Sequence, residues 1–94
     1  MRNPLVVIDV SSVADARHLH RLLAEGLAFP AWYGRNWDAF WDAITGLVDM
    51  PERLRFVGWH AFEQRLGAEA RIMKACLDRM SEAFPARAAQ VEYA

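Results

Sequence analysis

The chain has 94 residues, of which 54% are hydrophobic and 24% charged, with a formal net charge of −1. This length predicts one domain over residues 1–94 with a modest core, and the apolar content excludes a disordered chain. The near-neutral charge argues against general nucleic-acid binding, which needs a surplus of Lys and Arg on one face. No apolar run approaches the roughly 20 residues that span a bilayer, and the first ten residues lack a secretory signal, so a cytoplasmic protein without a membrane partner is expected.

Three segments have the composition of strands. Residues 5–8 (Leu-Val-Val-Ile) form a continuous apolar run, which predicts a central strand buried on both faces of a parallel sheet. Residues 53–57 alternate polar and apolar side chains before Gly58, which predicts a strand with one better-buried face at an edge of the sheet. Residues 90–94 would form a third, short strand.

Helical patterns fill the spaces between these strands. A capping-box pattern at residues 12–15 and Gly26 predict a helix from about Ser12 to Glu25. Asn36 is a good N-cap for a helix over residues 37–48, and a short helical turn is expected near residues 61–65. Alternating strands and helices predict an α/β fold with a small parallel sheet covered by helices.

The longest predicted helix runs from Ala68 to about Ala83 and is followed by Pro85. Its apolar stripe is predicted to face the core, and the opposite face is interpreted as solvated. The predicted stripe consists of Ile72, Cys76, Met80 and Phe84.

The middle of the chain is acidic. Residues 29–52 hold one basic and four acidic side chains, a sum of −3. Asp38 and Asp42 lie four residues apart on one side of the predicted helix, and Thr45 and Asp49 continue that side. The helix dipole favours an Asp in the first turn, which accounts for Asp38, but Asp42 lies beyond that turn and has poor helix propensity. Structure alone therefore explains Asp42 least.

The same region is crowded with aromatic side chains, six within thirteen residues. Aromatic anchors beside carboxylates are typical of protein interfaces. We assign Phe40 and Ile44 to the core, whereas Trp37 and Trp41 suit either core or contact, and Trp32, in an ordered loop with Pro30 and Gly34, favours contact. The six are Phe29, Trp32, Tyr33, Trp37, Phe40 and Trp41.

The sequence supports an enzymatic function less well than a binding function. The chain has no Gly-rich phosphate loop after its first strand and no HExxH or CxxC motif, so neither a cofactor nor a metal ion is expected. Its three histidines are scattered, and Cys76 has no second cysteine with which to form a disulfide. Asp38 and Asp42 could act as the acid and base of a hydrolase, but neighbouring turns of one exposed helix do not make a water-excluding cleft. An Mg²⁺ or Ca²⁺ site would need further oxygen ligands from elsewhere.

Residues 29–42 (FPAWYGRNWDAFWD), followed by Ile44-Thr45-Gly46, resemble the signature of the barstar family of ribonuclease inhibitors. The resemblance implies a three-stranded parallel sheet with about four helices, and an inhibitor that plugs the active site of a small basic ribonuclease. The two helix carboxylates would take the place of substrate phosphates, with Asp42 the deeper plug. The implied partner contacts are Trp32, Asn36, Trp37, Asp38, Trp41, Asp42, Thr45 and Gly46.

Some residues depart from the family pattern. Arg35 stands where the best-known member carries an acid, and the net charge is less negative than such inhibitors often show. An acid of the later helix that contributes in the family has no assigned counterpart, since Leu77 falls near its position and Asp78 beside it. Arg35 and the charge motivate a second hypothesis, in which the fold is a regulatory or scaffold module for a protein that is not a nuclease.

Overall fold

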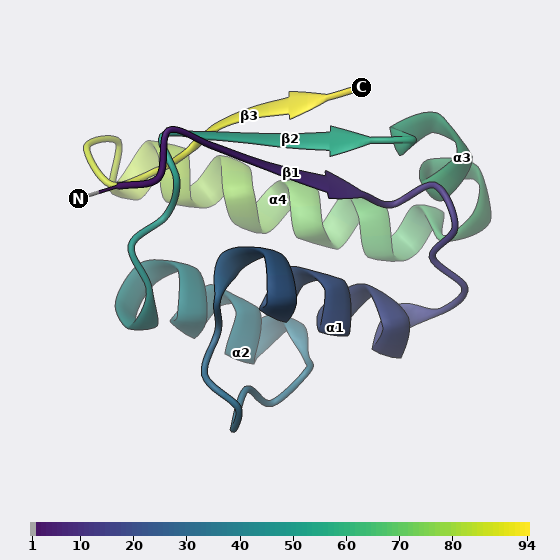
Figure 1. The fold of residues 1–94 in the computed structure, drawn as a ribbon, viewed down its shortest axis with the longest axis horizontal. Coiled ribbons are helices and arrows are strands. Elements are labelled where there is room, and N and C mark those ends of the chain that lie inside the picture. Colours follow the sequence, from purple (N-terminus) through teal and green to yellow (C-terminus); the bar gives the residue numbers. More distant parts are fainter. Residues whose placement is uncertain (1) are drawn as a thin grey trace.

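The computed structural model describes residues 2–94 and has the predicted α/β organisation. Three strands alternate with helices, and a π-helical turn, η1, extends α2 (Figure 1). In chain order the elements are β1 (Leu5–Asp9), α1 (Ala16–Leu27), α2 (Trp37–Asp42), η1 (Ala43–Leu47), β2 (Arg53–Val57), α3 (Trp59–Arg65), α4 (Gly67–Ala83) and β3 (Gln90–Tyr93).

The sheet is parallel throughout and its strands follow the order β1-β2-β3, which confirms the predicted three-stranded sheet. The predicted positions of the first two strands were wrong, because β2 is central and β1 lies at an edge. The apolar run of β1 does not mean burial on both faces, since Leu5 is 36% and Val7 51% exposed. Helices α1, α2 and α4 lie on one side of the strands and α3 lies at the end of β2 (Figure 1), while the outward residues Leu5, Val7 and Arg53 of the other face are exposed.

Charged pairs occupy that outward face and explain why a central strand alternates in polarity. Arg55 of β2 stands opposite Glu92 of β3, and its Nε donates to the Glu92 carboxylate at 2.8 Å. Arg53 donates to the same carboxylate. The side chains of Leu54 and Phe56 point the other way and are fully buried.

Helix α1 begins later than predicted. The Asp15 carboxylate, rather than Ser12, caps it by accepting from the His18 N–H at 2.8 Å. The residues before it are committed to a turn, in which the Val13 N–H donates to the Val10 carbonyl. The helix ends with Ala28 in the left-handed conformation (φ 58°), while Gly26 stays helical where a Cβ would come within 2.8 Å of the Ile8 side chain.

The helix predicted over residues 37–48 forms, but it changes from α2 into the π-helical η1 at Ala43. Asn36 caps it as predicted, accepting from the Ala39 N–H at 2.7 Å. Phe40 and Ile44 are fully buried, which confirms their assignment to the core.

The buried face of α4 is not the predicted one. Of the predicted stripe only Met80 is buried, whereas Ile72 is 41% and Phe84 39% exposed. A smaller and a more flexible side chain, Ala70 and Met73, pack inward in place of the bulkier Ile72. The helix is therefore rotated relative to the prediction, which turns Ile72 and Cys76 toward α2.

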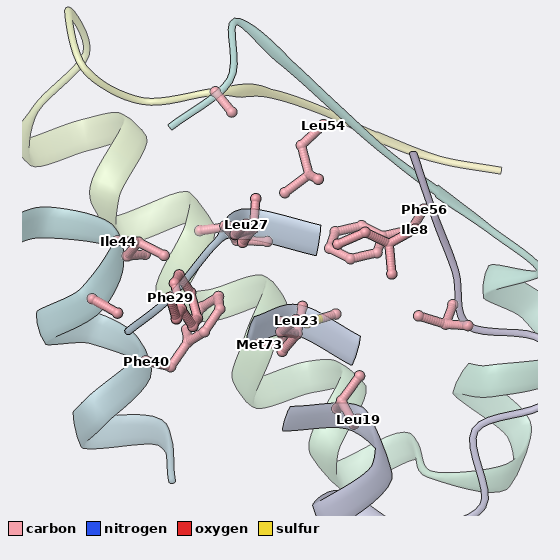
Figure 2. Packing of buried hydrophobic residues seen from close by; sticks show 14 of the residues in the cluster. Ile8, Leu19, Leu23, Leu27, Phe29, Phe40, Ile44, Leu54, Phe56 and Met73 are labelled. Atoms are coloured by element: carbon pink, nitrogen blue, oxygen red, sulfur yellow. The ribbon is translucent and has the colours of Figure 1, made fainter. Parts of the chain in front are cut away.

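The core lies between the helices and the covered face of the sheet, where apolar side chains from every layer point toward one another (Figure 2). None of the helices within residues 2–94 is long and apolar enough to cross a membrane. The largest fully buried side chains are Phe40, Phe56, Phe62, Leu19, Leu23, Ile44, Leu54, Met73, Met80, Val10 and Val13.

Candidate protein-binding surface

A groove of about 440 Å³ separates α2 from α4. The two helices are in direct contact beneath it. We call it the α2–α4 groove. Its walls are formed by Trp37, Asp38, Trp41 and Asp42 from α2 and by Ile72, Cys76 and Arg79 from α4.

The groove brings together both carboxylates and both α2 tryptophans that the sequence predicts as partner contacts. Asp38 and Asp42 are exposed. Neither takes part in an ion pair with any residue of 2–94, even though Arg79 lines the same groove. Two like charges at this spacing disfavour the helix by about 0.2–0.5 kcal/mol. The helix dipole offsets this repulsion at Asp38, which lies in the first turn, whereas nothing within residues 2–94 pairs with the charge of Asp42.

Trp41 is half-buried and held from two sides. The Arg79 guanidinium lies over its ring, with Cζ 4.3 Å from the ring centroid, an arrangement that is attractive for a cation on an indole face. The Thr45 hydroxyl donates to the Trp41 carbonyl at 2.6 Å. Trp41 is therefore a preorganised part of the groove wall, and the Thr45 hydroxyl is already used within the helix.

Trp37 makes more contacts within the fold than a residue that served only to bind a partner would make. Its indole N–H donates to the Glu69 carboxylate of α4 at 2.7 Å. Its ring packs edge-on against Phe40, with centroids 5.3 Å apart, and 4.4 Å from the ring of His20. Trp37 joins α2 to α1 and α4, and only part of its surface faces the groove.

The loop before α2 presents the most exposed large apolar side chain of the surface, Trp32, which is 72% exposed. The next residue, Tyr33, is buried, and its hydroxyl lies 2.7 Å from His20 Nδ1. The left-handed residue of this loop is Arg35 (φ 54°) rather than Gly34. Tyr33 thus anchors the loop while Trp32 points away from the core.

The remaining predicted contacts lie outside the groove. Asn36 is engaged as the helix cap, and its side-chain N–H donates back to the Gly34 carbonyl at 3.3 Å. Gly46 is exposed in η1, with open space where a side chain would be. Trp32 and Asn36 therefore border one end of α2, and Gly46 lies beyond the other.

Sequence reasoning missed three residues that shape this surface, His20, Glu69 and Arg79. A signal existed for His20, because it follows Leu19 on the face of α1 that also buries Leu23. Glu69 and Arg79 carried no such signal, since their contacts depend on how α4 packs against α2. They became recognisable as site residues only through the fold.

His20 is buried, its ring packs against Tyr33 and Trp37, and the Glu69 carboxylate is close enough to affect its charge. We therefore expect the stability of the fold to depend on pH. Burial lowers the pKa of His20 below its usual 6.5, and the nearby Glu69 carboxylate opposes that effect. As pH falls below 6.5, the unfolded chain takes up a proton that the folded chain does not. We expect the free energy of unfolding to fall by up to about 1.4 kcal/mol per pH unit until the pH reaches the lowered pKa.

Urea unfolding at pH 7.5 and 5.5 measures this dependence. His20→Gln should flatten it, because an amide has no proton to gain in this range. His60→Gln, at an exposed position of α3, is the matched control and should leave the dependence as in the unmodified chain. An unchanged pH dependence in His20→Gln would show that other groups cause it.

Comparison with known proteins identifies the family of this chain. The family model described as "Barstar (barnase inhibitor)" matches residues 3–93. A protein of Bacillus subtilis (strain 168) named "Putative ribonuclease inhibitor YrdF" is 38% identical over 65 residues, which cover 69% of this chain and 71% of that protein. These matches confirm the resemblance seen in residues 29–46, and the chain belongs to the barstar family.

Proposed function

We propose that the chain is a protein inhibitor of a small basic ribonuclease, which it blocks by inserting the acidic face of α2 into the catalytic site. One observation carries the proposal: Asp38 and Asp42 are exposed carboxylates, without an ion pair within residues 2–94, between two preorganised tryptophans. The family description and the name of the Bacillus protein support a ribonuclease as the target.

The proposed mechanism follows from the chemistry of the target. A ribonuclease binds the phosphates of RNA with basic side chains, and a carboxylate is a compact anion that the same side chains can hold through short, charge-assisted hydrogen bonds. The four-residue spacing separates Asp38 from Asp42 by about 6 Å along the helix axis, so two basic sites can be occupied at once. The role is that of a stoichiometric plug that performs no chemistry and protects the RNA of the cell that makes the nuclease.

Titration tests the proposal. The purified chain is added to the ribonuclease secreted by the producing cell, and cleavage of a fluorogenic RNA is followed. We expect activity to fall linearly to zero near a 1:1 molar ratio. Full activity at a tenfold excess of the chain would overturn the proposal. Recovery of a non-nuclease protein in a pull-down that depends on Asp42 would favour the scaffold hypothesis instead.

Trp32→Ala should weaken the complex without weakening the fold. An exposed Trp that becomes buried in an interface is a frequent hot spot, worth about 2 kcal/mol or more, or roughly a thirtyfold rise in the dissociation constant. Because Trp32 is 72% exposed, its truncation should leave the thermal midpoint within about 1 °C. Inhibition titrations and thermal melts of the same preparation measure both quantities. An unchanged dissociation constant would exclude Trp32 from the interface.

A further inference from the structure

Three exposed arginines adjoin α2 and η1, the segment that carries the acidic face. Arg35 directly precedes the cap of α2 and, together with Arg21, lines a second groove between α1 and the loop. Arg79 lies along one side, within the α2–α4 groove. Arg87, from the segment before β3, donates to the Thr45 carbonyl in the middle of η1. We call Arg35, Arg79 and Arg87 the arginine frame.

The frame is exposed, and its charges are not neutralised within the described chain. All three side chains are exposed, and the ion pairs among residues 2–94 include none of them. Arg79 shares a groove with Asp38 and Asp42, yet its guanidinium rests on Trp41 rather than on either carboxylate. The surface therefore keeps its negative and positive charges apart, and both signs remain available to a partner.

The backbone at Arg35 shows that this arginine is held in a costly position. Its φ of 54° lies in the left-handed region, which glycine and asparagine adopt far more readily than arginine. The preceding Gly34 does not take this conformation. Strain of this kind often lies at functional sites, where another benefit offsets it. A contact between the Arg35 guanidinium and a partner would be such a benefit.

We propose that the partner's basic catalytic centre is bordered by acidic side chains, and that the arginine frame binds these and selects such a ribonuclease over uniformly basic ones. The inference rests on the proposed function and specifies its target. The surface carries two carboxylates and three guanidinium groups, so a partner that was basic throughout would be repelled by the frame as it docked. Guanidinium groups pair well with carboxylates because two parallel hydrogen bonds can form.

Reversing the charge of a frame arginine should slow association with a partner that has an acidic border. The same change should speed association with a partner that is basic throughout. Association rates with the ribonuclease that the unmodified chain inhibits are measured by stopped flow at about 0.05 M and 0.5 M salt. We expect Arg35→Glu and Arg79→Glu to associate about three to ten times more slowly at low salt, with the difference shrinking at high salt because screening weakens charge steering. Faster or unchanged association of both variants would overturn the inference.

Two controls separate the frame from net charge and from folding. Arg17→Glu, at an exposed position of α1 in its first turn, makes the same charge change and should associate within about twofold of the unmodified chain. Arg35→Gly removes the strained side chain, so it should raise the thermal midpoint while still slowing association. A gain in stability with no loss in association rate would also overturn the inference. Failure of the unmodified chain to inhibit any ribonuclease would instead overturn the proposed function, and the inference with it.

Discussion

Asp42→Ala is expected to raise the dissociation constant of the ribonuclease complex by about 10²- to 10⁴-fold. In the complex the carboxylate would be desolvated against basic side chains, and removing one partner of a buried ion pair costs about 3–5 kcal/mol. The loss should appear mainly as faster dissociation, since the deepest contact forms after the first encounter. Dissociation rates from competition experiments measure it directly.

The same substitution should leave the free chain as stable as before. Asp42 is exposed, has no ion pair within residues 2–94 and sits where α2 passes into η1. Alanine has the better helix propensity by about 0.5 kcal/mol, so the free energy of unfolding should stay constant or rise slightly. Loss of binding together with loss of stability would mean that Asp42 supports the fold and would contradict its assignment as the plug.

Glu63→Ala provides the matched control for this prediction. Glu63 is an exposed acid of α3, which lies away from α2 (Figure 1), and its removal changes the net charge by the same amount. It should alter the dissociation constant by less than about threefold, because distant exposed charges are screened. Equal effects of Glu63→Ala and Asp42→Ala would show that net charge, rather than a placed carboxylate, controls binding.

Local chemistry made part of this fold predictable from sequence. The Asn36 cap and the apolar period of residues 37–48 involve neighbours along the chain, and they gave the correct helix with its core residues Phe40 and Ile44. Strand order depends on contacts between distant segments. The uniform apolar run of β1 pointed to the centre of the sheet, yet β2 takes that place, with Leu54 and Phe56 fully buried and its outward arginines paired with Glu92 of β3.

The candidate site shows the same division. Spacing alone placed Asp38 and Asp42 on one side of a helix, and the α2–α4 groove brings both of them together with Trp41. The other wall comes from α4, whose predicted core stripe was out of phase. Because Ile72 and Cys76 were assigned to the core, no role was predicted for Arg79, although it stacks on Trp41. An error of one residue in the helical phase thus hid the basic part of the surface.

Gly58→Ala is expected to destabilise the fold by about 2–6 kcal/mol, a large share of the roughly 5–15 kcal/mol available to a chain of this size. Gly58 joins β2 to α3 with φ 73°, a conformation that costs a residue with a side chain about 1–3 kcal/mol. A Cβ there would also lie 2.3 Å from the Ser11 Cβ and 2.7 Å from the Ser11 Cα. Overpacking of this kind adds about 1–3 kcal/mol. Urea unfolding measures the sum.

The size of this effect depends on whether Ser11 can move aside, and its contacts indicate that it cannot do so cheaply. The Asp9 carboxylate accepts from the Ser11 N–H at 2.9 Å, and Arg65 donates to the Ser11 carbonyl at 3.0 Å. Gly67→Ala is the control, because Gly67 begins α4 with nothing within 4 Å of an added Cβ, and alanine there should cost nothing. If the two variants unfolded at the same urea concentration, the prediction would be wrong. The loop that contains Ser11 would then make room for a side chain at position 58 without a measurable loss of stability.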